Sequence, residues 1–214
     1  MVSESSRDGF VPGSEFVSRE TREKLRHYAD LVRKWQASIN LISAKTLPNL
    51  WERHILDSLQ LFRLQPNPLT WLDMGSGAGF PGLVTAICLA EMEAGWVHLV
   101  ESNNKKAAFL RQVILETGAR ASVHPIRVEA ACDELGKIDA VSARALASLP
   151  DLLEYAALFA VGNPSLEMWF HKGLDYPEEV RSARDLWRFD LIEHQGLAQD
   201  GSAILQISNL SKCN

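Results

Sequence analysis

The chain has 214 residues, of which 46% are hydrophobic and 23% are charged. This composition is that of an ordinary globular protein, and the length suits one domain with a sizeable core and a small appendage. The formal net charge of -5 does not predict a general nucleic-acid binder, so any contact with RNA must come from local basic patches.

The sequence also argues against a membrane or metal protein. It contains no apolar run of about 18 residues, and its polar N-terminus does not resemble a signal peptide. Its three cysteines, Cys88, Cys132 and Cys213, form no pair at metal-binding spacing. We therefore expect a cytoplasmic, metal-free protein with reduced thiols and no membrane partner.

The N-terminal third reads as a leader followed by a helical extension. Residues 1–17 are polar and contain glycine and proline, so we expect a disordered leader there. Residues 18–66 form the expected helical extension. Its first helix, from Ser18 to about Asn40, follows from apolar residues three and four positions apart. The second is expected over residues 49–62.

The second expected helix carries His54, Asp57 and Ser58, which are the residue types of a hydrolase triad. All of them lie within five residues on one helix. They cannot therefore align a nucleophile, its base and an orienting acid. We expect instead an ion pair of Arg53 with Asp57 and a hydrogen-bonded His54.

After the prolines of residues 65–68, strands alternate with helices to the end of the chain. Strands are expected over 71–74, 96–100, 121–128, 138–142, 166–170, 189–193 and 203–207, and helices over 103–117, 129–135, 148–160 and 177–187. Residues 67–214 therefore predict an α/β domain with a doubly wound, mostly parallel seven-stranded Rossmann-like sheet that ends in an antiparallel hairpin. Ligands of such sheets bind beyond the carboxyl ends of the strands.

A glycine-rich turn follows the first strand of this domain. Gly75, Gly77 and Gly79 alternate along it, so its backbone can adopt positive φ and approach a ligand closely. The segment from Gly77 to Gly82 matches a dinucleotide-binding fingerprint, but there the first glycine should close the strand, and here Gly75 does so. With Asp73 two residues before Gly75, the pattern instead resembles motif I of the class I S-adenosylmethionine (AdoMet) methyltransferases.

Charged residues gather where the following strands end. Glu101 closes the second strand, where a carboxylate can accept hydrogen bonds from both ribose hydroxyls of AdoMet or of NAD. Lys105, Lys106 and Arg111 begin the next helix, where cations oppose the helix dipole, and this conflict favours a functional contact with phosphate. An arginine at the end of the fourth strand, Arg144, can pair with a carboxylate or a phosphate.

Several motifs follow one another in a family-specific order. They are Arg53-His54-Ile55-Leu56-Asp57-Ser58, the glycine-rich turn ending in Phe80-Pro81-Gly82, Phe109-Leu110-Arg111-Gln112, Arg127-Val128-Glu129, Ser142-Ala143-Arg144-Ala145 and Lys172-Gly173. Together they resemble the RsmG (GidB) family of bacterial small-subunit ribosomal RNA methyltransferases. The resemblance runs from about residue 20 to 207, nearly the whole chain.

The resemblance implies AdoMet-dependent methylation of N7 of a guanine in the decoding region of 16S rRNA, free or within the small ribosomal subunit or its precursor. Together with motif I it implies cofactor contacts at Asp73, Gly75, Gly77, Gly79, Phe80, Glu101, Val128, Glu129 and Arg144. The candidates for RNA contact are Lys105, Lys106, Arg111, Arg127 and Lys172. We expect a monomer.

The expected chemistry requires no catalytic base. Guanine N7 has a free lone pair and no proton to lose, so positioning and exclusion of water would supply the catalysis. Arg144 is the candidate nearest to the reacting atoms, and its guanidinium is a poor base. The alternatives are an NAD-linked oxidoreductase and a non-catalytic AdoMet-binding module.

Overall fold

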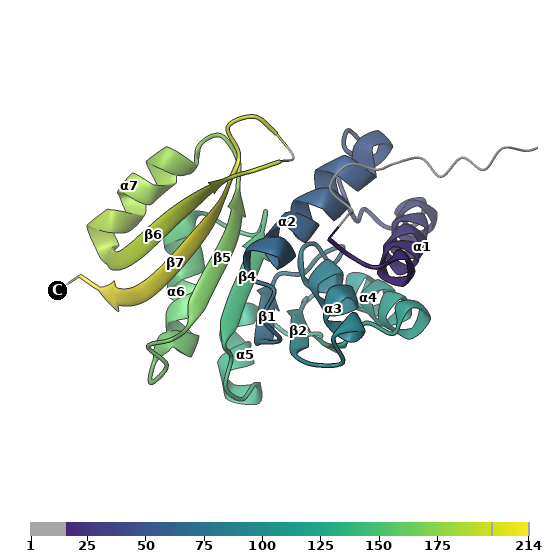
Figure 1. Ribbon diagram of the computed structural model, residues 1–214. Coiled ribbons are helices and arrows are strands. Elements are labelled where there is room, and N and C mark those ends of the chain that lie inside the picture. The colour runs from purple at the N-terminus through teal and green to yellow at the C-terminus, as the bar shows by residue number, and fades with distance from the viewer. Residues whose placement is uncertain (1–15, 198, 214) are drawn as a thin grey trace, which may run out of the picture.

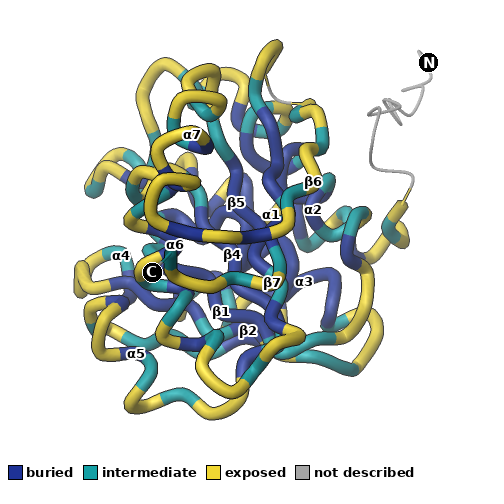
Figure 2. Tube along the Cα trace, turned by 90° about the vertical axis from the view of Figure 1, so that its left-hand side faces the viewer, coloured by how far each residue is buried: buried dark blue, intermediate teal, exposed yellow. Residues whose placement is uncertain are grey.

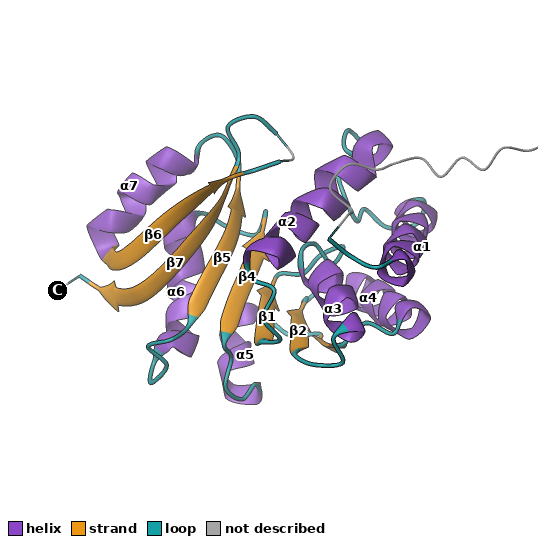
Figure 3. Cartoon of the chain, viewed as in Figure 1, coloured by secondary structure: helices purple, strands orange, loops and turns teal. Residues whose placement is uncertain are grey.

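The computed structural model of the chain describes residues 16–197 and 199–213. One seven-stranded sheet runs through the molecule in the order β3-β2-β1-β4-β5-β7-β6 (Figures 1 and 3). The strands are β1 (Thr70–Met74), β2 (Trp96–Val100), β3 (Ala121–His124), β4 (Ala140–Arg144), β5 (Glu167–Lys172), β6 (Trp187–Gln195) and β7 (Ala203–Lys212). The pairs among β1 to β5 are parallel, and β7 pairs antiparallel with both β5 and β6. The predicted sheet and its C-terminal hairpin are thus confirmed.

Helices cover both faces of the sheet. They are α1 (Arg19–Gln36), the short 3-10 helix η1 (Leu47–Asn49), the π-helical η2 (Trp51–Leu56), α2 (Asp57–Leu64), α3 (Gly82–Glu91), α4 (Asn104–Thr117), α5 (Val128–Glu134), α6 (Leu149–Ala160) and α7 (Tyr176–Leu186). Trp71 packs into a core with α1 to α4, whereas its neighbour Leu72 packs into a second core with α5 to α7. Because side chains alternate along a strand and both faces are covered, the central strands are apolar on both faces and buried (Figure 2).

The N-terminal extension is part of the first core. Leu25 and Val32 of α1 are fully buried there, and α1 lies beside α3 and α4 (Figure 1). The helix ends at Gln36, short of the predicted Asn40, because the Gln36 side chain accepts hydrogen bonds from the backbone N–H groups of Leu41 and Ile42 and so stabilises a turn. Of the predicted leader, residues 1–15 lie outside the described part, and Val17 packs against the core.

Two further predicted elements differ from the structure at positions that matter for the site. The third strand does not reach Val128: it ends at His124, since Pro125 has no N–H group to continue the ladder. Arg127 instead precedes α5, and Val128 begins that helix. The predicted helix over 49–62 is a succession of η1, η2 and α2 with a π-helical turn in the middle, a feature often found at functional sites.

Among the described residues, no helix is both long and apolar enough to cross a membrane.

Candidate functional site

A cavity of about 480 Å³ opens at the carboxyl ends of β1, β2 and β4. This volume lies in the range of small-molecule sites. The cavity brings together most of the predicted cofactor residues, namely Gly75, Gly77, Phe80, Glu101, Val128, Glu129 and Arg144. Lys106 and Arg127 also line it, together with residues from the N-terminal extension that include Leu41, Thr46 and His54.

The glycine-rich loop has the conformation that its sequence predicts. Gly75, Gly77 and Gly79 have φ values of +62°, +56° and +95°. A Cβ atom on Gly77 would meet nothing closer than 3.7 Å, so this glycine leaves the loop open to a ligand. A Cβ atom on Gly79 would lie 2.4 Å from Leu83 Cδ1 and 2.8 Å from the Tyr28 hydroxyl oxygen, so Gly79 permits close packing beneath the loop.

Glu101 connects this loop with the end of β2. One carboxylate oxygen accepts a hydrogen bond from the Gly77 N–H group at 2.9 Å, and the other accepts from the Asn103 N–H group at 2.7 Å. The Asn103 side chain in turn caps α4. Glu101 is therefore a fixed carboxylate on the cavity wall.

Asp73 lies outside the cavity lining formed by the described residues, and it is 1% exposed. Its carboxylate accepts a hydrogen bond of 2.7 Å from the Ser142 hydroxyl group on the neighbouring strand β4. Burial raises the pKa of this carboxyl group to about 6, although the bond from Ser142 acts in the opposite direction. Asp73 thus joins two strand ends beneath the loop.

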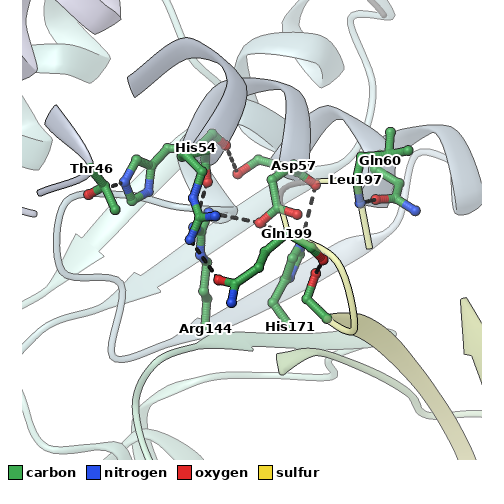
Figure 4. Close-up of polar contacts among 11 residues, drawn as sticks. Thr46, His54, Asp57, Gln60, Arg144, His171, Leu197 and Gln199 are labelled. Atoms are coloured by element: carbon green, nitrogen blue, oxygen red, sulfur yellow. Dashed lines mark hydrogen bonds and ion pairs between the residues drawn. The ribbon is translucent and has the colours of Figure 1, made fainter. Parts of the chain in front are cut away.

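Arg144 is the last residue of β4, and Ala145 after it has a φ of +52°, which is rare for a residue with a side chain. One guanidinium nitrogen lies 3.0 Å from the Asp57 carboxylate, and another donates a 2.7 Å hydrogen bond to the Arg53 carbonyl oxygen (Figure 4). The sequence predicted Arg53 as the partner of Asp57, and the structure pairs Asp57 with Arg144.

His54 packs against Phe80, which follows the glycine-rich loop. Its ring centroid lies 5.0 Å from that of Phe80, and its Nε2 atom lies 2.9 Å from the Thr46 hydroxyl oxygen (Figure 4). Burial, with the nearby Arg144 and Arg53 charges, lowers the His54 pKa to about 3, so the ring is neutral at pH 7. The Ser58 hydroxyl donates to the His54 backbone carbonyl oxygen.

The predicted RNA-binding residues have different surroundings. Lys106 and Arg127 lie on the wall of the cavity, whereas Lys105 and Arg111 are exposed on α4. The Lys172 ammonium group is largely buried, ion-paired with Glu179 at 2.5 Å and hydrogen-bonded to the Ala147 carbonyl oxygen. Lys172 is therefore the least accessible of these residues to a phosphate.

A second cavity of about 340 Å³ adjoins the first. Arg144 and Ala145 line both cavities. The second is also lined by Arg53, Asp57, His171 and Lys172. The Arg144 side chain thus stands at the boundary between a cofactor-sized space and a second polar space.

Sequence reasoning missed the part played by the N-terminal extension. The Tyr28 hydroxyl donates to the Ala78 carbonyl oxygen of the glycine-rich loop, and the Tyr28 ring lies 5.1 Å from that of Phe80. Tyr28 and Asp57 lie on amphipathic helices. The periodicity of such a helix predicts which residues are buried or polar, but it does not show which of them belong to a functional site. The family-specific motif from Arg53 to Ser58 contains Asp57 and was the sequence signal that could have indicated its part in the site.

The strand order distinguishes this fold from the dinucleotide-binding fold, in which a sixth parallel strand continues the sheet after the fifth. Here β7 is inserted antiparallel between β5 and β6. The fold is similar to that of magnesium protoporphyrin IX methyltransferase from Synechocystis PCC 6803 with bound SAM (TM-score 0.57, 10% identity, covering 90% of this chain and 98% of that chain). It is also similar to the ribosomal protein L11 methylase of Lactobacillus delbrueckii subsp. bulgaricus (TM-score 0.54, 20% identity, covering 72% of this chain and 77% of that chain).

The fold is that of the class I AdoMet-dependent methyltransferases. The family model described as rRNA small subunit methyltransferase G, GidB, matches residues 21–206, and the chain belongs to this family. It is 59% identical over 198 residues to the ribosomal RNA small subunit methyltransferase G of Rhizobium meliloti (strain 1021), covering 92% of each chain. It is 56% identical to the protein of the same name from Sinorhizobium medicae (strain WSM419), again covering 92% of each.

Proposed function

We propose that the protein methylates N7 of a specific guanine in the decoding region of 16S ribosomal RNA, with AdoMet as methyl donor. The observation that carries this proposal is the membership of nearly the whole chain in the GidB family, with the family-like motifs converging on one cavity. The substrate is the small ribosomal subunit or a precursor of it, and the enzyme acts in the cytoplasm as a monomer without a metal ion.

The residues of the first cavity suit AdoMet. The Glu101 carboxylate would accept the ribose hydroxyl groups, and Val128 and Glu129 would flank the adenine at the start of α5. Gly75 and Phe80 would face the amino-acid moiety, with Arg144 available to its carboxylate. Gly77 keeps the loop open, and Gly79 and Asp73 support it from beneath.

When bound, AdoMet supplies a methyl group on a positively charged sulfur. This chain's residues then need only bring the guanine N7 lone pair into line and exclude water. The second cavity gives room for a base extruded from its stack, and Arg144 lies between the two spaces. His54 is neutral, and its Nε2 atom faces Thr46, so it fits a packing role better than that of a base.

The RNA backbone would be held by cations around the cavity mouth. Lys106 and Arg127 lie at the cavity itself, and Lys105 and Arg111 extend the basic surface along α4. Lys172 would contribute only if the RNA displaced its partner Glu179. Phosphate contacts of this kind fix the orientation of the substrate but do not select the guanine.

The test is transfer of labelled methyl groups from AdoMet to unmodified small subunits, with naked 16S rRNA, tRNA and DNA assayed in parallel. We expect label at a single guanine, which becomes cleavable by chemistry specific for N7-methylguanine. Label at another atom or in another RNA would contradict the proposed acceptor. Binding of AdoMet without label on any RNA would favour a non-catalytic module.

A further inference from the structure

A buried ion pair joins the N-terminal extension to the functional site. Asp57, the first residue of α2, is 5% exposed. Its carboxylate lies 3.0 Å from a guanidinium nitrogen of Arg144, whose side chain is 17% exposed (Figure 4). The two residues are far apart in the sequence, and they meet only because η2 and α2 pack over the ends of β4 and β5.

A second residue of the same segment, Arg53, also contacts Arg144. The Arg53 carbonyl oxygen accepts a 2.7 Å hydrogen bond from another guanidinium nitrogen. His171 on β5 also faces Asp57, with its Nε2 atom 3.2 Å from the Asp57 carbonyl oxygen and 3.9 Å from the carboxylate oxygen that Arg144 contacts. Arg144 therefore has two anchors within one turn of helix, and Asp57 is itself held against β5.

Stability alone does not account for this arrangement. Removing two charges from water costs about as much as their attraction returns, and an apolar pair of similar size often stabilises a fold equally well. What the pair does fix is the direction of a long, flexible side chain. That side chain lines both cavities, so its orientation decides which charges face the cofactor and the acceptor.

We propose that Asp57 is a positioning residue, which holds the Arg144 guanidinium at the boundary between the two cavities. The inference rests on the proposed function, in which these cavities take AdoMet and the target base. The N-terminal extension is then part of the functional site, because without Asp57 the Arg144 side chain loses its charged anchor.

The test is a double-mutant cycle read by AdoMet titration, which requires no RNA. Asp57→Asn keeps the shape of the side chain and removes its charge, and Arg144→Met removes the guanidinium. We expect each to weaken AdoMet binding about tenfold, which corresponds to about 1.4 kcal/mol. The double variant should be no weaker than Arg144→Met, since Asp57 acts through Arg144.

The matched control is Asp139→Asn. Asp139 directly precedes β4, at the end of the strand opposite to Arg144, and it accepts a hydrogen bond from the Thr70 N–H group. It should leave AdoMet affinity unchanged. If Asp57→Asn does not fold, Asp57→Glu, which keeps the charge but displaces it, should fold and show an intermediate affinity. Additive losses in the cycle, or wild-type affinity of the Asp57 variants, would overturn the proposal. A failure of the proposed function is distinct, because it would appear as wild-type AdoMet binding without methylation of RNA.

Discussion

At the scale of single residues, the glycines of the loop between β1 and α3 meet different requirements. Gly77 has positive φ but open space where a Cβ atom would lie. Gly82 begins α3 without that φ, yet a Cβ atom on it would lie 2.5 Å from Leu99 Cδ2 and 2.6 Å from an Asp73 carboxylate oxygen. Gly82 therefore lets the helix pack closely on the sheet.

Two alanine variants should separate these requirements. Gly77→Ala should fold and lose about 1–2 kcal/mol, the cost of a left-handed residue with a side chain. Gly82→Ala should lose about 3 kcal/mol or more, because it combines overpacking with displacement of a buried carboxylate. Urea unfolding measures both, and equal stability of the two variants would contradict this division.

His54 should contribute to the pH dependence of the free energy of unfolding. Its folded pKa of about 3 lies below the ordinary value of 6.5, so between these values the unfolded chain binds a proton that the folded chain does not. Stability is therefore lost as pH falls through this window, by up to about 1.4 kcal/mol per pH unit. His54→Gln keeps a polar partner for Thr46 and does not titrate, so its stability should fall less steeply.

The measurement is the urea midpoint of wild type and His54→Gln at several pH values from about 4.5, inside the window, to about 7.5, above it. The difference between the two proteins is the relevant quantity, because the raised pKa of Asp73 acts in the opposite direction in both. Parallel curves would show that His54 is protonated in the folded state as readily as in the unfolded chain.

At the scale of elements, the sequence predicted most of what depends on local pattern. Apolar runs predicted the strands, and the alternating glycines predicted the loop after β1 with its positive φ values. Glu101 and Arg144 were predicted together because the carboxyl ends of parallel strands meet at one edge of a sheet. The third strand was predicted too long because its apolar residues continue past Pro125, which ends the hydrogen-bonded ladder.

Contacts between distant elements could not be predicted in this way. The bond from Tyr28 to the glycine-rich loop and the pair of Asp57 with Arg144 join segments far apart in the chain. Periodicity shows that a face of a helix is buried, but it does not show which loop or strand that face will meet. The contribution of the N-terminal helices to the site therefore required the structure.

The contact of α1 with the loop leads to a prediction for Tyr28→Phe. The Tyr28 hydroxyl is buried, and burial raises its pKa well above 10, so it remains a neutral donor to the Ala78 carbonyl oxygen. The variant leaves this buried acceptor unpaired, which should cost about 1–3 kcal/mol. Because the loop also loses its anchor, AdoMet affinity should fall as well.

The matched control is Tyr176→Phe, which removes an exposed hydroxyl that donates to Glu193 at 2.7 Å. It should change stability by less than about 0.5 kcal/mol and leave AdoMet affinity unchanged. Thermal melts with and without AdoMet measure both stability and AdoMet affinity. Wild-type stability and affinity of Tyr28→Phe would show that α1 does not support the loop.

At the scale of the whole molecule, an acidic protein is proposed to bind a polyanion. The net charge of -5 opposes approach of RNA from a distance, so the attraction must come from the basic residues near the cavity mouth. The structure divides this group, because Lys106 lines the first cavity, where AdoMet is proposed to bind, and Lys105 is exposed on α4. Substitution of both lysines together would therefore mix cofactor and RNA effects, and single substitutions are needed.

Lys105→Ala should weaken binding of the small subunit or its RNA without changing AdoMet affinity. If Lys105 contacts one phosphate, the slope of log K against log salt concentration should become shallower by about 0.7–0.9, because one fewer counterion is released. Lys137→Ala is the control, since Lys137 is exposed and pairs with Asp139 at the other end of the sheet. Binding measured over a series of salt concentrations gives the slopes, and an unchanged slope for Lys105→Ala would place the RNA backbone elsewhere on the surface.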